Sequence, residues 1–63
     1  MYRQLGRYDE ALADLNRAIE LDPADAEAIG SRGQTYRLLG RLVEALADLN
    51  RARELDPGYE PGD

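Results

Sequence analysis

An all-α fold of tandem helix-turn-helix units, an α-solenoid fragment, is predicted by three observations. First, residues 10–23 (EALADLNRAIELDP) return as residues 44–57 (EALADLNRARELDP), and the two copies differ only at Ile19 and Arg53. Second, the repeat of 34 residues extends upstream, because 18 of the first 23 residues are identical to their partners. Third, apolar residues in each copy recur three and four positions apart, which is the spacing of one helix face. A repeat unit of this kind buries its apolar side against its neighbours.

The first copy, residues 1–23, is expected to be a truncated unit. Residues 1–5 correspond to the end of a longer helix in the second copy, and Gly6 is expected to end this short segment. A helix is then predicted from about Tyr8 to Leu21, because proline at position 23 disfavours helical geometry in the residue before it. The apolar side of this helix consists of Tyr8, Ala11, Leu12, Leu15, Ala18 and Ile19.

A complete second unit is predicted over residues 24–57. Asp25 is a suitable N-cap for its first helix, and Glu27 lies in the first turn, where the helix dipole favours a carboxylate. This helix is expected to run to about Leu39 and to end at Gly40. Its predicted buried stripe consists of Ala26, Ile29, Gly33, Tyr36 and Leu39. The second helix is predicted to repeat the apolar side of the first copy with Leu42, Ala45, Leu46, Leu49, Ala52 and Leu55.

The end of the second copy differs from the first in two ways. Arg53 replaces Ile19, which indicates a face that no following helix covers, and terminal repeats of solenoids need such a polar outer surface. Residues 58–63 contain two glycines and a proline and are predicted to form a flexible tail.

Length and charge limit the possible functions. The 63 residues form one small domain, and without cysteine or histidine neither a disulfide nor a zinc-type site adds stability. The sequence has eight arginines and 13 carboxylates, which gives a net charge of −5. A nucleic-acid binder instead concentrates positive charge on one surface. No apolar run approaches the roughly 20 residues of a membrane span, and no signal-peptide core follows Met1. We expect a cytoplasmic protein without nucleic-acid or membrane partners.

A unit of 34 residues with small residues at fixed positions and a closing proline resembles the tetratricopeptide repeat (TPR). The signature of that family is W-x2-L-G-x2-Y, then A-x3-F, then P. Three departures from it are Ile29 and Leu49 in place of the aromatic residues and Arg32, a charged side chain, in place of a buried leucine. The residues that stand at signature positions are Tyr2, Ala11, Leu15 and Pro23 in the first copy and Ile29, Gly33, Tyr36, Ala45, Leu49 and Pro57 in the second.

The resemblance implies a non-catalytic module for protein–protein interaction. In this family, stacked units wind into a superhelix whose concave surface, lined by the first helix of each unit, binds an extended peptide or a partner's helix. Arg3 and Arg37 lie one repeat apart, so that each guanidinium can pair with a carboxylate of a bound chain. The groove residues carried over onto this sequence are Arg3, Gln4, Glu27, Gln34, Arg37 and Leu38.

Residues suited to catalysis or to binding a cofactor are few. The sequence has no His, Cys or Lys, one Ser and one Thr, and nucleophilic catalysis needs a positioned base beside its nucleophile. The acidic cluster of Asp22, Asp25 and Glu27 lacks the ligand order and the central glycine of a calcium loop. We therefore predict no enzyme activity, no cofactor and no metal.

A second hypothesis remains open beside peptide binding by a module that is part of a longer repeat array. The chain is then a structural element that associates with itself, in which another copy covers the open edge near residues 8–19. Stacking or exchange of a helical hairpin would give a homo-oligomer, closed if symmetric and filamentous if not.

Overall fold

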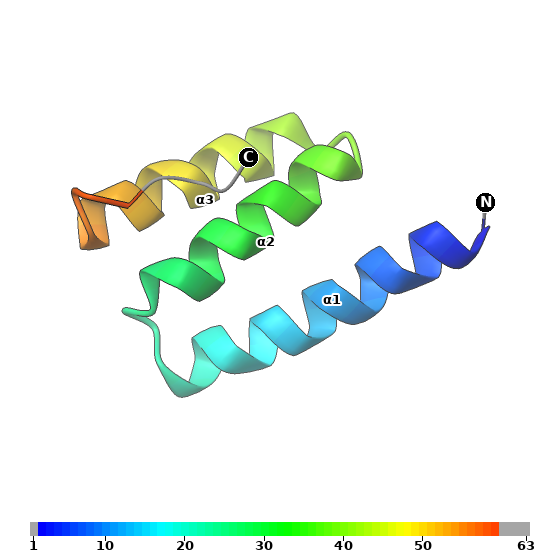
Figure 1. Cartoon of the computed structure of the whole chain (residues 1–63), viewed down its shortest axis with the longest axis horizontal. Helices are drawn as coiled ribbons and strands as arrows, with labels where there is room; N and C mark the ends of the chain where they lie inside the picture. The colour runs from blue at the N-terminus through cyan, green and yellow to red at the C-terminus, as the bar shows by residue number, and fades with distance from the viewer. Residues whose placement is uncertain (1, 60–63) are drawn as a thin grey trace.

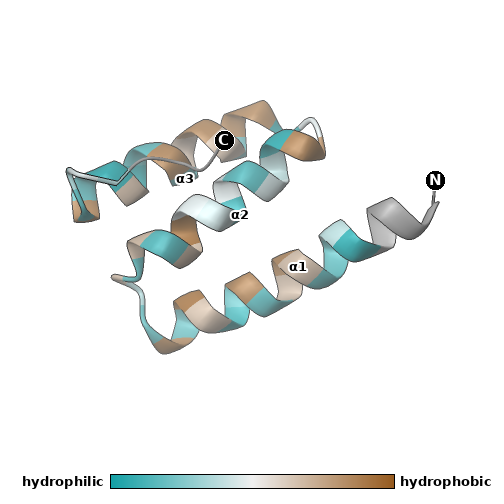
Figure 2. Ribbon diagram, in the orientation of Figure 1, coloured by the Kyte–Doolittle hydropathy of each residue, from teal (hydrophilic) through white to brown (hydrophobic). Residues whose placement is uncertain are grey.

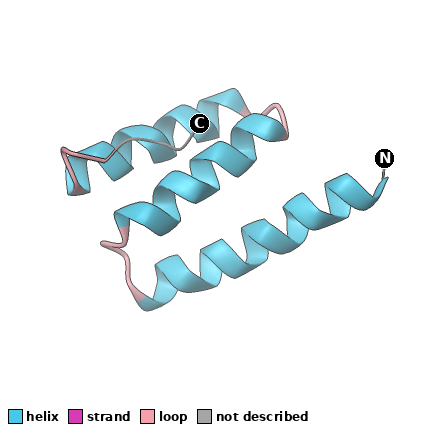
Figure 3. Ribbon diagram, in the orientation of Figure 1, coloured by secondary structure: helices cyan, strands magenta, loops and turns pink. Residues whose placement is uncertain are grey.

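The structure is a computed structural model that describes residues 2–59, with side chains described from Arg7 onward. The described part contains three helices, α1 (Tyr2–Leu21), α2 (Ala26–Leu38) and α3 (Leu42–Leu55), and no strand (Figures 1 and 3). The predicted all-α class is confirmed. None of these helices is both long and apolar enough to cross a membrane.

The three helices lie side by side with α2 in the middle, and each runs antiparallel to the one before it (Figure 1). α3 packs against α2 more extensively than α1 does, and in the described part of the chain α1 and α3 do not contact each other. Every contact between the two repeats therefore passes through α2.

The predicted helix stop at Gly6 is wrong, because α1 continues through it without interruption. The matching glycine of the second copy, Gly40, does end a helix and has a positive φ of 83°. Its N–H donates to the carbonyl of Arg37 (3.0 Å) and that of Arg41 to the carbonyl of Tyr36 (2.9 Å), which is a Schellman motif. This turn folds α3 back onto α2. Beside α1, no described helix occupies the corresponding place, so continuing the helix satisfies the backbone hydrogen bonds.

The two Asp-Pro turns have the same hydrogen bonds. The N–H of Asp22 donates to the carbonyl of Ala18 (2.9 Å), and that of Asp25 donates to the carbonyl of Asp22 (3.1 Å). The Asp22 carboxylate accepts from the N–H of Ala24 at 3.1 Å. The three equivalent bonds recur at Asp56-Pro57. The first turn separates α1 from α2 and the second follows α3, as the sequence predicts.

The start of α2 follows the prediction. The Oδ1 of Asp25 accepts a hydrogen bond from the N–H of Ala28 at 3.2 Å, so Asp25 is the N-cap, and Glu27 lies in the first turn. α2 ends at Leu38, and Leu39 is its C-cap.

The core consists mainly of small residues on α2 and α3. A Cβ on Gly33 would lie 3.1 Å from the carbonyl oxygen of Ala45, so the two backbones approach closely. Three residues of the predicted stripe, Ala26, Tyr36 and Leu39, are only half-buried. The buried apolar residues and glycines are Ala28, Ile29, Gly30, Gly33, Ala45 and Ala52, of which Ala28 and Gly30 were not predicted.

On α3, the predicted apolar side is only partly covered. Leu49 and Leu55 are half-buried, whereas Leu42 and Leu46 are exposed. Figure 2 shows that apolar residues gather at the start of α3, near the turn that follows α2.

The alanine contacts give a matched test of this packing. Ala45 is 2% exposed against α2, whereas its repeat partner Ala11 is only half-buried on α1. Overfilling a packed site costs about 1–3 kcal/mol, so we expect Ala45→Leu to lower the free energy of unfolding by that amount. For Ala11→Leu we expect a change within about 0.5 kcal/mol. Urea unfolding followed by circular dichroism measures both, and equal losses would contradict this packing.

Candidate interaction surface

The four described groove residues lie on one side of α2. Gln34 follows Glu27 by seven positions, and Leu38 follows Gln34 by four, which places them along the same side of a helix. Arg37 and Gly30 lie on this side as well, seven residues apart. Glu27, Arg37 and Leu38 are exposed, Gln34 is half-buried and Gly30 is buried. We call this the open side of α2, because Arg32 and Gly33, which contact α1 and α3, lie on its other sides.

The remaining groove residues, Arg3 and Gln4, belong to the first part of α1, and their side chains lie outside the described part of the structure, as does that of Tyr2. The other signature residues differ in burial. Ile29, Gly33 and Ala45 are buried, Ala11, Leu15, Tyr36 and Leu49 are half-buried, and Pro23 and Pro57 are exposed in the two turns.

Arg37 carries the positive charge of the open side. Its Nη2 donates a hydrogen bond to Oε1 of Gln34 at 3.1 Å. A guanidinium has five N–H donors in a planar fork, so this bond orients the group along the helix and uses one donor. Glu27, ten residues earlier, places a negative charge near the start of the helix. The open side is therefore basic at its C-terminal end and acidic at its N-terminal end.

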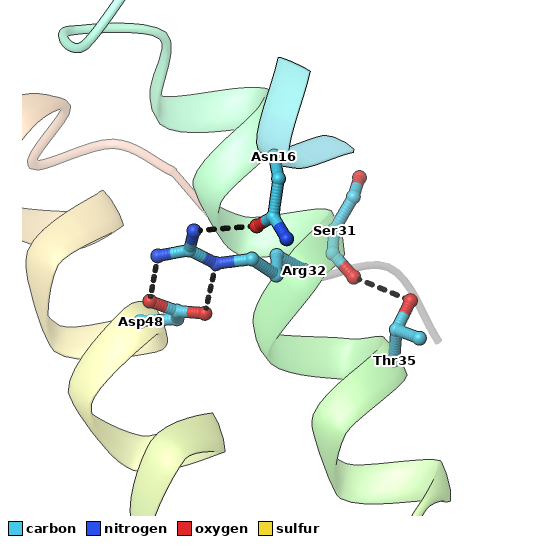
Figure 4. Close-up of polar contacts among 5 residues, drawn as sticks. All are labelled: Asn16, Ser31, Arg32, Thr35 and Asp48. Atoms are coloured by element: carbon cyan, nitrogen blue, oxygen red, sulfur yellow. Dashed lines mark hydrogen bonds and ion pairs between the residues drawn. The ribbon is translucent and has the colours of Figure 1, made fainter. Parts of the chain in front are cut away.

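Arg32, the residue that departs from the family signature, connects all three helices (Figure 4). Its Nε and Nη2 each lie 2.8 Å from an Oδ atom of Asp48 on α3, and its Nη1 donates to Oδ1 of Asn16 on α1 at 2.9 Å. The Arg32 and Asp48 side chains are 25% and 10% exposed. The hydrogen bond with Asp48 raises the pKa of the guanidinium, although burial opposes this. A buried leucine is thus replaced by a paired charge that joins the repeats.

Tyr36 lies between two arginines. The guanidinium carbons of Arg32 and Arg41 lie 5.9 and 6.0 Å from its ring centroid, which is within the range of cation–π attraction. Arg41 comes from the turn before α3, so this contact links the turn to the ring.

An open depression of about 620 Å³ lies at the end of the molecule where the two Asp-Pro turns meet. Three of its four acidic groups are engaged in local structure, because Asp22 and Asp56 each accept a backbone hydrogen bond and Asp25 caps α2. Among the described residues, no group of three or more metal-binding side chains is present. The depression is lined by Asp22, Ala24, Asp25, Ala26, Glu27, Leu55, Asp56 and Tyr59.

Tyr59 contributes a contact that sequence reasoning missed. Its phenol ring lies against Gly30, in the middle of the open side of α2. An interior helix glycine is unfavourable by about 1 kcal/mol relative to alanine, so Gly30 itself was the signal of a close approach. Its partner lies 29 positions away in the segment predicted as a tail, of which residues 60–63 lie outside the described structure.

Antiparallel helices that recur every 34 residues and pack in chain order define a helical repeat protein. Two family models match the chain, one described as TPR repeat over residues 1–36 and one as tetratricopeptide repeat over residues 26–59. Each covers more than half of the sequence, and the chain belongs to the tetratricopeptide repeat family. Repeats of this family generally mediate protein–protein interaction and are typically non-catalytic. A search of curated proteins finds no match.

The role of Arg32 can be measured directly. Replacing it with leucine leaves the Asp48 carboxylate 10% exposed and without its partner, so we expect a loss of about 2–3 kcal/mol in the free energy of unfolding. The double variant Arg32→Leu/Asp48→Ala should lose less than the two single variants together, by about 1.5 kcal/mol or more.

Asp14 provides the control for this cycle, because it is the exposed repeat partner of Asp48. Asp14→Ala should change the unfolding free energy by less than about 0.5 kcal/mol. If the single substitutions at positions 32 and 48 simply add in urea unfolding, the ion pair does not stabilise the fold.

Proposed function

We propose that this protein binds an extended, acidic segment of a partner protein along the open side of α2. Arg37 is the observation that carries the proposal. It is exposed, it lies on the side of the helix that the neighbouring helices leave open, and the hydrogen bond to Gln34 orients its guanidinium. A planar guanidinium held in this way matches a carboxylate, with which it forms two parallel hydrogen bonds.

The charges along the open side give the partner a direction. A carboxylate of the bound segment pairs with Arg37 near the end of α2, whereas Glu27 repels it near the start. Gln34 lies between them and accepts the hydrogen bond that orients Arg37. The side chains of Arg3 and Gln4 lie outside the described part of the structure, so the proposed surface consists of residues of α2.

Exposed charge pairs contribute modestly, so the binding energy is shared between this pairing and apolar contact. Leu38 is 60% exposed at the end of the open side, one residue after Arg37. The partner segment is therefore expected to place an apolar side chain beside its carboxylate.

The test replaces one exposed arginine at a time and measures binding to a library of acidic peptides at low salt. Arg37→Ala should leave helicity unchanged and weaken the peptides that bind by about 3- to 30-fold, as for the loss of a charged hydrogen bond. Arg53→Ala, an exposed arginine on α3, is the matched control and should bind like the unaltered protein. Equal affinity of both variants would remove Arg37 from the site.

Self-association is a second candidate, and the exposed leucines of α3 favour it. Leu42 and Leu46 are 59% and 62% exposed, whereas their repeat partners Tyr8 and Leu12 are half-buried on α1. The difference follows from α2, which packs on α1, whereas no described helix packs on the equivalent side of α3. A helix from another copy placed there would cover this apolar surface.

The polar network around Arg32 repeats this asymmetry. Its partners Asn16 and Asp48 have repeat equivalents in Asn50 and Asp14, and both of these are exposed. Each edge of the molecule therefore presents half of an arginine site, with Asp14 at one edge and Asn50 at the other. A helix that carries an arginine, packed on either edge, would complete the network.

Sedimentation equilibrium at several concentrations tests this candidate. We expect the unaltered protein to associate at micromolar concentration and Leu46→Glu to remain a monomer, because the charge cannot be buried unpaired. Ala47→Glu, at the next position on another exposed side of α3, is the control and should associate normally. An unaltered protein that is a folded monomer throughout excludes self-association.

A further inference from the structure

Gly30 is buried by the ring of Tyr59, which arrives from the segment after α3. A Cβ placed on Gly30 would overlap the Oη and Cζ atoms of Tyr59 and would lie 2.7 Å from its Cε2. The phenol therefore rests on the bare backbone of α2, in a notch that exists only because residue 30 has no side chain. We call this place the Gly30 notch.

Local hydrogen bonds direct Tyr59 toward the notch. The N–H of Tyr59 donates to the carbonyl of Asp56 at 2.8 Å, and that of Gly58 donates to the Asp56 carboxylate at 3.1 Å. The same turn in the first copy places Asp25, the N-cap of α2, at the equivalent position. Tyrosine is a poor N-cap, so the residue at position 59 does not start a helix in the same way. Its side chain lies on the preceding repeat instead.

The notch lies within the surface proposed to bind a partner. Gly30 is three residues after Glu27, four before Gln34 and seven before Arg37, so all four lie on the open side of α2. A ring that covers Gly30 therefore occupies the middle of that side. Tyr59 is only half-buried there and is held by a short turn at the end of α3, so it can leave without unpacking a helix.

We propose that the Gly30 notch is the binding site for a tyrosine side chain of the partner segment, and that Tyr59 fills it in the free protein. This inference rests on the proposed binding function and names the side chain that the open side selects. The partner is an extended segment with a tyrosine flanked by carboxylates, because Arg37 lies two turns from the notch on the same side. The chain's own sequence Gly-Tyr-Glu-Pro-Gly-Asp, residues 58–63, has this composition.

The consequence is competition between Tyr59 and the partner. The apparent affinity for the partner equals the intrinsic affinity multiplied by the fraction of molecules whose notch is free. If Tyr59 occupies the notch in 90% of the molecules, the partner binds about tenfold more weakly. A short tether gives Tyr59 an effective concentration on the order of millimolar, which a free peptide must match.

The probe is a synthetic, N-acetylated peptide of residues 58–63, titrated to millimolar concentration against the full chain. We expect Tyr59→Ala to bind this peptide at least about tenfold more tightly than the unaltered protein does. The double variant Gly30→Ala/Tyr59→Ala should lose binding, because the new methyl group fills the notch, and alanine favours helix at this position. Ser31→Ala/Tyr59→Ala is the matched control and should bind. A peptide with alanine in place of tyrosine should not bind.

Three results overturn the proposal. They are equal affinity of the unaltered protein and Tyr59→Ala, binding that survives Gly30→Ala, and no binding by Tyr59→Ala at millimolar peptide. Binding of acidic peptides that depends on Arg37, measured in parallel, reports separately on the proposed function. If that binding persists while the tyrosine peptide fails, only the assignment of the notch is wrong.

A measurement on the unaltered protein keeps the proposal testable should Tyr59→Ala not fold. The ring beside Gly30 displaces the Gly30 Hα resonances from their ordinary positions in the NMR spectrum, and adding the peptide should leave them displaced, since one tyrosine replaces another. An ordinary chemical shift for these protons in the unaltered protein overturns the occupancy by Tyr59.

Discussion

The ion pair between Arg32 and Asp48 is the interaction on which the rest of the structure depends, because it is the one polar contact among the described side chains that reaches all three helices through Asn16. Two parallel bonds of 2.8 Å fix the rotation of α2 against α3, and the third bond fixes α1 against both. A leucine at this position would pack without direction, whereas the guanidinium fork specifies one geometry. The position thus contributes register as well as stability.

The fixed rotation of α2 decides which residues meet the neighbouring helices and which remain open. Gly33 and Ile29 then face α3, where a Cβ on Gly33 would meet Ala45, Asp48 and Leu49 at 3.1 Å. Arg32 itself faces α1 and α3, and the opposite side, with Gln34 and Arg37, is left to solvent or to a ligand. The rotation of α2 about its axis determines both its buried and its exposed sides. Arg32, which joins the repeats, therefore also determines the surface available for binding.

The elements of this fold could be predicted from the sequence because their signals are local. Proline at 23, the cap at Asp25 and the glycine at 40 act on adjacent backbone groups, and the structure has a turn, an N-cap and a Schellman motif at these places. The pairing of Arg32 could not be predicted, because both of its partners lie 16 residues away on other helices. Alignment with a family signature indicated only that a leucine was missing.

The candidate site was predictable to the same limited extent. Helical spacing alone places Glu27, Gln34 and Arg37 on one side of a helix, so the open side follows from the sequence once α2 is assigned. The Gly30 notch does not follow from the sequence, because it depends on how close α2 lies to residues 58–63. The glycine and proline content of that segment predicted only that it is flexible. A contact of this kind has no periodicity and is visible only in three dimensions.

Residues 2–7 and 36–41 show how far packing overrides local sequence in this molecule. They share Tyr-Arg-x-Leu-Gly-Arg, yet Gly6 lies inside α1, whereas Gly40 lies in the turn that ends α2. Glycine tolerates both states, at a cost of about 1 kcal/mol inside a helix, so neighbouring packing decides between them. In the second copy, the turn lets α3 cover α2 and bury Ala45 and Ala52. A helix packed beside α1 would bury apolar residues of the first copy in the same way. The turn at Gly6 would then be favoured over continuous helix. The conformation of residues 2–7 therefore reports whether the edge of α1 is covered.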